Sequence, residues 1–272
     1  MTDYDKLYIG GKWVAPATDQ VLEVFSPATE ERVGSCPVAS PADIDDAVAV
    51  ARRAFDEGPW PQTTPAERGE ILAKAAKLIE ERGETLNALI SSEMGQPPAM
   101  VGMMQQTPSL ATLNFYAGLA NEFEWEQTRT GVFGQTKVLR EPVGVVAAVL
   151  AWNVPLFLAV NKLSPALLAG CTVLLKPAPE SPLSTHVLAE IFAEAGVPEA
   201  SSPFCPAAPR PVNTWSRIPA STRSRSPAAV PSAARSGPSP RRTSSAAPSN
   251  WAASRRPSSS RTPTSRPRCR CW

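Results

Sequence analysis

The first forty residues carry short apolar runs separated by turn residues, a pattern that predicts β-strands. Residues 7–9 and 12–14 flank Gly10 and Gly11, and two adjacent glycines supply the positive φ angles that a two-residue turn needs. We therefore expect a hairpin at residues 7–14 and a second strand pair within residues 21–38.

From residue 40 to residue 121 the apolar positions recur every three or four residues, which predicts amphipathic helices. Ser40 and Pro41 suit the N-cap and the first position of one helix. The spacing of Thr64 and Glu67 is that of a capping box, and it opens a longer helix that runs until Gly95 and Pro97 stop it. A third helix is expected near residues 108–121.

The second half of the body changes from exposed to buried patterns. Residues 123–140 alternate charged and apolar positions around two glycines, which predicts an exposed antiparallel pair. Residues 143–150 are continuously apolar, as in a strand buried on both faces of a parallel sheet. A helix over 155–169, a strand over 172–176 and a helix that Ser181-Pro182 opens and Gly196 ends complete a right-handed βαβ unit.

Two polar segments follow the two parallel strands, where open α/β sheets bind ligands. Asn153 either caps the next helix or donates its amide to an oxyanion. Lys176 is either a solvated lysine before a proline-rich turn or a cation that meets the ribose or phosphate of a nucleotide. Neither G-x-G-x-x-G after a strand nor G-x-x-x-x-G-K-[ST] occurs, so spacing alone does not establish nucleotide binding.

Other candidate chemistry is sparse. The single histidine, His186, lies in an apolar helical pattern and is expected to be structural, and Cys171 begins a buried strand, where an inert thiol is expected. Cys269-Arg270-Cys271 has no histidine beside it, and we predict no metal site. The chain has no apolar run of 18 residues, so we expect no membrane-spanning segment. Its first residues are not a basic stretch followed by an apolar one, as in a secretory signal peptide, so we expect a cytoplasmic protein.

Taken together, several motifs resemble the N-terminal part of the NAD(P)-dependent aldehyde dehydrogenase family. They are IGGKWV, SPATEERVG, EMGQP, REPVGVVAAVLAWNVPL and LAGCTVLLKPAPESPLS, spread over residues 7–198. The resemblance implies an α/β fold in which residues 1–122 and 141–200 form part of a Rossmann-like coenzyme domain, a parallel sheet with flanking helices. It also implies that the 123–140 hairpin serves oligomerisation, with an aldehyde as substrate, NAD or NADP as coenzyme and a homo-oligomer as the assembly.

The resemblance also assigns roles to site residues. It implies that Asn153 is an oxyanion-hole donor, the one catalytic residue expected here, and that Lys176 contacts the adenosine ribose. Where the family has P-W-N-[FY]-P, this chain has Ala151 and Val154. Where many NAD-selective members place a glutamate, it has Pro179, with Glu180 one residue later, so the coenzyme choice stays open. The expected coenzyme-binding residues are Ala151, Trp152, Asn153, Lys176, Pro179 and Glu180.

Composition divides the chain at about residue 200. Residues 1–200 contain 14 Lys and Arg and all 25 Asp and Glu, a formal charge of −11, whereas residues 201–272 contain 13 Arg, no Lys and no acid, a charge of +13. The net charge of +2 is the sum of these opposites. Ser, Pro, Arg and Ala dominate the last 72 residues, so we expect a disordered tail there.

The tail lacks the family's FTGS segment, its general-base ELGGK segment and its nucleophilic cysteine. The tail can be back-translated into possible codons and read one base out of step. In that frame residues 201–212 can encode L-S-V-L-P-G-G-P-E-T-G, part of residues 222–234 can encode K-V-S-F-T-G-S, and residues 247–255 can encode T-L-E-L-G-G-K-S. The three windows share one frame and follow the family's order. We therefore hypothesise that a shift of reading frame near Ala200 produced the tail, and that the chain is a truncated, inactive fragment without nucleophile or base.

An alternative function rests on the same tail. Thirteen arginines, including Arg223, Arg225 and the Arg241-Arg242 pair, would contact phosphates, and tryptophans such as Trp251 would stack on bases. The tail has neither lysine nor RGG repeats, so nucleic-acid binding is the less favoured hypothesis.

Overall fold

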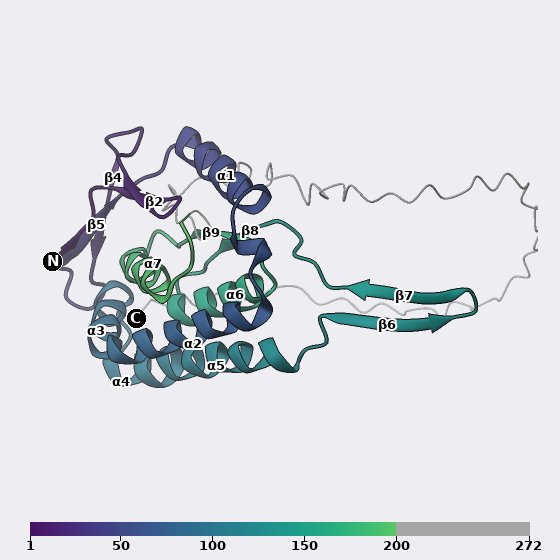
Figure 1. Ribbon diagram of the computed structural model, residues 1–272. Coiled ribbons are helices and arrows are strands. Elements are labelled where there is room, and N and C mark those ends of the chain that lie inside the picture. The colour runs from purple at the N-terminus through teal and green to yellow at the C-terminus, as the bar shows by residue number, and fades with distance from the viewer. Residues whose placement is uncertain (200–272) are drawn as a thin grey trace, which may run out of the picture. The chain divides into compact units, whose positions relative to one another are not determined.

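The N-terminal strands form two small sheets in the computed structural model, which describes residues 1–199 (Figure 1). Strands β2 (Leu7–Ile9) and β3 (Lys12–Val14) pair antiparallel, and both turn glycines have positive φ, 64° for Gly10 and 81° for Gly11. The predicted hairpin is therefore confirmed. The predicted second pair is present as β4 (Val21–Phe25) and β5 (Arg32–Pro37), also antiparallel.

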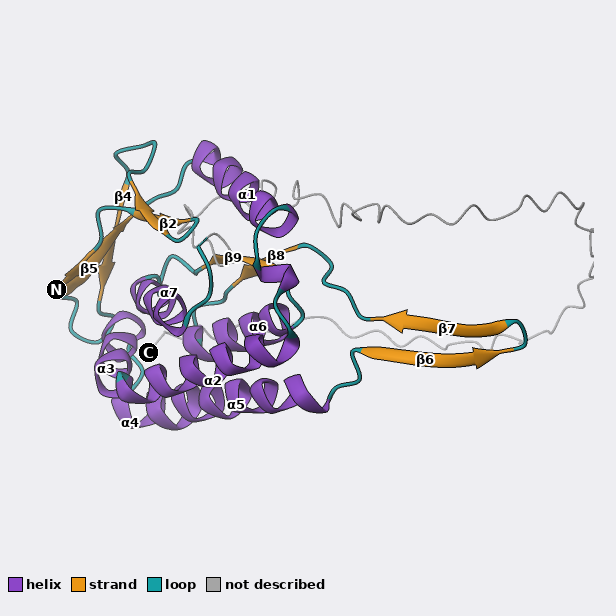
Figure 2. Ribbon diagram, in the orientation of Figure 1, coloured by secondary structure: helices purple, strands orange, loops and turns teal. Residues whose placement is uncertain are grey.

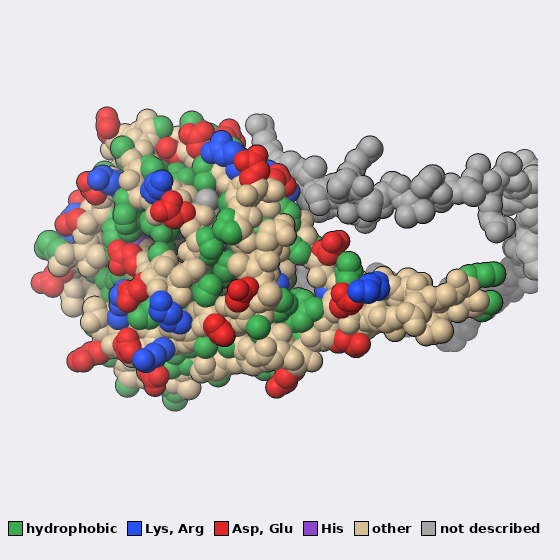
Figure 3. Space-filling model, in the orientation of Figure 1, with side chains coloured by type: hydrophobic (Ala, Val, Ile, Leu, Met, Phe, Trp, Pro, Cys, Tyr) green, Lys and Arg blue, Asp and Glu red, His purple; other side chains and the backbone are tan. Residues whose placement is uncertain are grey.

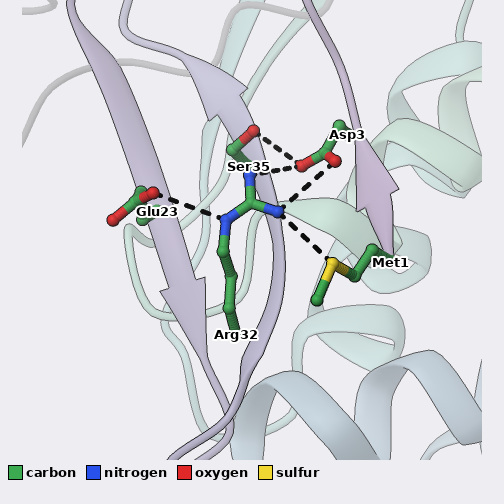
Figure 4. A network of polar contacts seen from close by, with 5 residues as sticks. All are labelled: Met1, Asp3, Glu23, Arg32 and Ser35. Atoms are coloured by element: carbon green, nitrogen blue, oxygen red, sulfur yellow. Dashed lines mark hydrogen bonds and ion pairs between the residues drawn. The ribbon is translucent and has the colours of Figure 1, made fainter.

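A third strand in the second sheet was not expected. Strand β1 (Thr2–Asp3) pairs in parallel with β5. Figure 4 shows the polar network that joins the three strands. The Nη2 of Arg32 lies 2.6 Å from Oδ1 of Asp3, and the Ser35 hydroxyl donates to the same oxygen at 2.8 Å. The Nε of Arg32 lies 3.4 Å from Oε1 of Glu23. The hydrogen bonds from Arg32 and Ser35 lower the pKa of Asp3.

The first two helices begin where their capping residues predict. Helix α1 (Pro41–Asp56) has Ser40 as N-cap, with the side chain of Asp43 closing a capping box. After a 3₁₀ turn, η1 (Trp60–Gln62), helix α2 (Pro65–Glu81) opens with the predicted box of Thr64 and Glu67.

The prediction of one continuous helix from Thr64 to Gly95 is wrong. Helix α2 ends at Glu81, Arg82 adopts φ −96° and ψ 10°, and a separate helix α3 (Gly83–Met94) follows. At Gly83 the chain approaches Gln106 so closely that an added Cβ would lie 2.0 Å from its Nε2 atom. Tertiary context can override local preference, and here the local pattern favours an uninterrupted helix where the chain has a break.

The third predicted helix is confirmed, with an irregular beginning. A short helix α4 (Pro98–Val101) continues into a π-helical turn η2 (Gly102–Gln106) and then into helix α5 (Thr107–Glu122). The N–H of Thr107 donates to the carbonyl of Gly102, five residues back, which is the π-helical spacing.

Strands β6 (Glu126–Gly131) and β7 (Gly134–Leu139) form the predicted antiparallel pair and extend away from the helices as an arm (Figure 2). Lys137 forms an ion pair with Glu126 across the two strands. The turn places Val132 and Phe133 almost wholly in solvent, with exposed fractions of 94% and 104%. Figure 3 shows these apolar side chains at the tip of the arm.

The strand–helix–strand order and the parallel pairing of the predicted βαβ unit are confirmed. Strand β8 (Val145–Val149) leads through helix α6 (Pro155–Leu168) to strand β9 (Thr172–Lys176), and the two strands pair in parallel from Val145↔Thr172 to Val149↔Lys176. Helix α7 (Leu183–Ala195) follows and ends at Gly196, whose φ is 108°. The helix opens at Leu183, with Pro182 as its N-cap residue.

Strand β9, and not β8, is buried on both faces. Leu174 packs in one apolar cluster with Ile44 and Ala51 of α1, while Val173 and Leu175 pack in another with α6. The two helices lie on opposite sides of the strand pair (Figure 1). The expectation that β8 is buried on both faces is wrong, because Ala148 is its one buried residue. Within residues 1–199 the sheet consists of β8 and β9, so the far edge of β8 has no strand beside it.

The larger apolar cluster lies among α2, α5, α6 and α7 and supports the βαβ unit. His186 lies on the side of α7 that faces the N-terminal strands: it is fully buried, its Nδ1 lies 3.0 Å from the carbonyl oxygen of Pro182, and its ring stacks on Tyr4. Burial lowers the pKa of His186 to about 4. Cys171 is 2% exposed. Both residues are placed in the core, as the sequence predicts.

Candidate functional site

The parallel pairing of β8 and β9 brings two loops to the same edge of the sheet. The backbone N–H of Leu150 donates to the carbonyl of Lys176 at 2.9 Å, which extends the pairing past the last residue of β8. Residues 150–154 and 177–182 therefore leave the sheet side by side, and the six predicted site residues belong to these loops or to the last position of β9.

A pocket of about 420 Å³ opens between these loops and the N-terminal strands. Three predicted site residues, Trp152, Pro179 and Glu180, line it together. Ala151, Asn153 and Lys176 are not among its lining residues. The rest of the wall is formed by Glu23, Val24, Phe25, Pro27, Glu93 and Met94.

The structure tests one of the two interpretations of Asn153, that its side chain caps the helix that follows. Val154 is the N-cap residue of α6 and makes no side-chain capping bond. Asn153 is exposed in the loop before it. The capping interpretation is therefore wrong, and the amide of Asn153 is open to a bound molecule.

Lys176 is half-buried, and so differs from the fully solvated lysine that was one of its two interpretations. Its Nζ donates to the carbonyl oxygen of Pro177 at 2.9 Å. Burial lowers the pKa of Lys176, and the negative charge of Glu180 acts in the opposite direction. The end of β9 thus holds a partly desolvated amine beside a carboxylate.

Glu93 is the wall residue that sequence reasoning missed. Its carboxylate, 2% exposed, accepts from the backbone N–H groups of Leu183 at 2.8 Å and Ser184 at 3.2 Å, and from the Ser184 hydroxyl. Burial raises the pKa of Glu93 to about 7, although these hydrogen bonds oppose the rise. The one signal in the sequence was EMGQP, which carried the family resemblance without suggesting a partner on α7.

The part of the chain that the structure describes has no group of three or more His, Cys, Asp or Glu side chains that could hold a metal ion. Within the same residues, no helix has both the length and the apolar character needed to span a bilayer. The tail, with its predicted disorder, its arginines and its shifted-frame windows, lies outside the described residues.

Comparison with known proteins identifies the family. The model of the aldehyde dehydrogenase family matches residues 13–214, beyond residue 198, where the resemblance noted from the motifs ends. A geranial dehydrogenase from Castellaniella defragrans is 37% identical over 197 residues, which are 72% of this chain and 41% of that enzyme.

Solved structures agree with the sequence match. A Mycobacterium tuberculosis aldehyde dehydrogenase complexed with NAD+ is 52% identical, with a TM-score of 0.76 over 80% of this chain and 44% of its own. An aldehyde dehydrogenase from Pseudomonas syringae, crystallised with NAD+ and octanal, is 36% identical with a TM-score of 0.71 over 75% and 41% of the two chains. The chain spans about two fifths of the length of the curated relatives it matches. It belongs to the aldehyde dehydrogenase family.

Proposed function

We propose that this chain forms part of the coenzyme site of an NAD(P)+-dependent aldehyde dehydrogenase. The observation that carries the proposal is the convergence of Trp152, Pro179 and Glu180 on one pocket at the carboxyl ends of two parallel strands. Such strand ends are where open α/β sheets bind nucleotides. Further support comes from two relatives of this fold that were crystallised with NAD+.

The donor set of the site fits a dinucleotide. A half-buried lysine at the end of β9 and a carboxylate on the next loop can bind ribose hydroxyls. Trp152, which lines the pocket with that carboxylate, offers an apolar face. We assign Lys176 to the adenosine ribose, with Ala151, Trp152, Pro179 and Glu180 around the coenzyme. When bound, the nicotinamide ring supplies the hydride acceptor.

Asn153 has a different role in this proposal. Its exposed amide donates to the oxygen of the aldehyde as negative charge develops on it, and a preorganised donor of this kind lowers the barrier to attack on the carbonyl. The attacking cysteine and the glutamate that activates water are the groups this sequence lacks. Cys171 and Cys36 do not replace the nucleophile, because both are buried and burial raises the pKa of Cys36 to about 12.

The test separates binding from turnover. We expect NAD+ titrated into the purified chain to quench tryptophan fluorescence, and Trp152→Phe to reduce the quenching. We expect no formation of NADH with octanal as substrate. Absence of NAD+ and NADP+ binding contradicts the assignment of the site, whereas turnover above a buffer control contradicts the proposed inactivity.

The choice between the two coenzymes depends on Glu180. A carboxylate near the ribose hydroxyls repels a 2′-phosphate, and Glu180 lines the pocket where Pro179 offers no charge. We expect Glu180→Gln to raise the affinity for NADP+ relative to NAD+ by about fivefold, the effect of one lost repulsion near the surface. Glu194→Gln, on the exposed face of α7, is the matched control.

The hypothesis that a shift of reading frame produced the tail has a separate test. We propose that the DNA that encodes residues 201–272 specifies, one base out of step, the FTGS and ELGGK segments of the family. Resequencing that DNA decides the matter, because the third codon positions must spell the family's residues in the shifted frame. An in-frame repair is expected to restore aldehyde oxidation.

The arm is proposed as an oligomerisation element. Val132 and Phe133 expose apolar side chains at its turn, a feature common at contact surfaces between proteins. Sedimentation velocity is expected to show a homo-oligomer that Phe133→Ser weakens, whereas Thr130→Ser, nearby on β6, leaves it unchanged. A monomeric wild-type chain contradicts this role.

A further inference from the structure

The two helices that follow the site loops begin without a capping side chain of their own. The N-cap residue of α6 is Val154 and that of α7 is Pro182, and neither makes a side-chain hydrogen bond to its helix. The first turn of a helix has backbone N–H groups with no partner inside the helix, so each needs an acceptor from elsewhere. In α1 and α2 the acceptor is the local serine or threonine.

For α7 the acceptor comes from the end of α3. The Glu93 carboxylate binds the N–H of Leu183 at 2.8 Å and that of Ser184 at 3.2 Å, across 90 and 91 residues of sequence. Ser184 also donates its hydroxyl to the same carboxylate. Above its pKa of about 7 the carboxylate is negatively charged and also interacts favourably with the helix dipole of α7.

For α6 the acceptor comes from the π-helical turn η2. The buried Oε1 of Gln105 accepts from the N–H of Leu156 at 3.2 Å. The Nε2 of the same amide donates to Oε1 of Gln96 at 2.7 Å and lies 3.2 Å from the sulfur of Met94. The two capping groups are therefore joined through the short segment that ends α3.

We propose that Glu93 and Gln105 are positioning residues of the coenzyme site, which hold the loops 177–182 and 150–154 by capping the helices that follow them. The inference rests on the proposed function only for the identity of the ligand. Each loop is fixed at its other end by the sheet, where Leu150 bonds to Lys176. With both ends fixed, Trp152, Pro179 and Glu180 keep their places around the pocket.

The first experiment measures hydrogen exchange of single amides by NMR in the full chain. Glu93→Met keeps the shape of the side chain and removes both acceptor oxygens, so the amides of Leu183 and Ser184 should exchange about tenfold faster, the usual effect of a lost cap. Glu93→Gln keeps one acceptor oxygen and should restore much of the protection. The matched control is Asp43→Asn, which alters a buried capping carboxylate on α1.

The second experiment compares neighbouring glutamines. Gln105→Met should speed exchange of the Leu156 amide by about tenfold and shift the ¹⁹F resonance of Trp152 in a chain labelled with 5-fluorotryptophan. Gln106→Met removes the bond from Asn87, 2.6 Å long, and should change neither signal. If Gln105 only stabilised the fold, its substitution would move resonances throughout the chain and would not act selectively on one loop.

The outcomes separate this inference from the proposed function. Faster exchange confined to α6 or α7, with a moved Trp152 signal, supports the positioning role. Unchanged exchange, or equal acceleration across the chain, overturns it, and so does equal behaviour of Glu93→Gln and Glu93→Met. An absence of NAD+ binding to the wild-type chain refutes the proposed ligand and leaves the exchange result intact.

Discussion

Two strand pairs of the same chain, β6–β7 and β8–β9, differ in what holds them. The arm is exposed along nearly its whole length, and its order depends on the backbone ladder and on surface contacts such as that between Lys137 and Glu126. Strand β9 has four buried residues out of five and helices packed on both faces. A two-stranded ribbon alone is at best marginally stable in water, so the strength of the second pair comes from its helices.

The largest effect is expected where a helix packs on the βαβ unit. Phe192 of α7 is 1% exposed and belongs to the main apolar cluster. Phe192→Ala removes buried area and leaves a cavity, so the free energy of unfolding should fall by about 4 kcal/mol. Urea denaturation followed by circular dichroism measures this, and a loss below about 1 kcal/mol would show that the cluster does not support the unit.

A second effect depends on pH. The pKa of Glu93 is raised to about 7 by burial, and Tyr4 and Cys36 add no charge near neutrality because burial raises their pKa values also. Between pH 4.5 and 7 the folded chain holds a proton that the unfolded chain has lost, so the stability from this group declines as pH rises, by roughly 3 kcal/mol.

Glu93→Gln should flatten that decline, since its amide does not titrate. Urea midpoints from pH 4.5 to 8 measure the slope for both chains. Glu180→Gln, in the same pocket wall, serves as the control for a more exposed carboxylate. Parallel slopes for wild type and Glu93→Gln would contradict the raised pKa.

A third prediction concerns binding and not stability. Lys176→Met keeps the length of the side chain and removes its charge, so NAD+ affinity should fall about tenfold, the cost of one charge-assisted hydrogen bond. Lys162→Met, on the exposed side of α6, should leave affinity unchanged. Isothermal titration calorimetry compares the two variants, and equal affinities would remove Lys176 from the site.

The smallest effect is expected on the arm. Val132→Ser should alter the free energy of unfolding by less than about 0.5 kcal/mol, because its side chain is 94% exposed and makes little buried contact. The same urea titration measures it. A loss near that of Phe192→Ala would show that the arm is held as firmly as the βαβ unit.

Local signals explain what could be predicted from sequence. The N-cap at Ser40, the capping box at Thr64 and the turn at Gly10-Gly11 involve partners within three residues, so pattern and spacing are sufficient to predict them. The two loops were predicted to lie together because each follows an apolar strand and parallel strands share one edge. The family resemblance then named Trp152 and Glu180 within them.

Distant contacts explain what could not be predicted. Glu93 bonds to residues 90 and 91 positions away, and Gln105 to one 51 positions away, and neither looks different from a solvated polar residue in its own helix. The close approach of Gly83 to Gln106 and the pocket wall formed by β4 have no marker in the local sequence. These features arise when separate elements meet, so the periodicity of one element contains no trace of them.

The π-helical turn η2 fixes the number of residues that this segment must contain. Its hydrogen bond from Thr107 to Gly102 spans one residue more than an α-helical bond. Deletion of one residue there would restore an α-helix and rotate everything before it by about 100° relative to α5. A deletion after Gln105 would turn its amide away from Leu156, and a deletion before it would turn Gln96 and Met94 away from the same amide. Apart from Gln105, the segment between Gly102 and Gln106 should accept many substitutions but no deletion, so homologous chains that share the two caps should also share this extra residue.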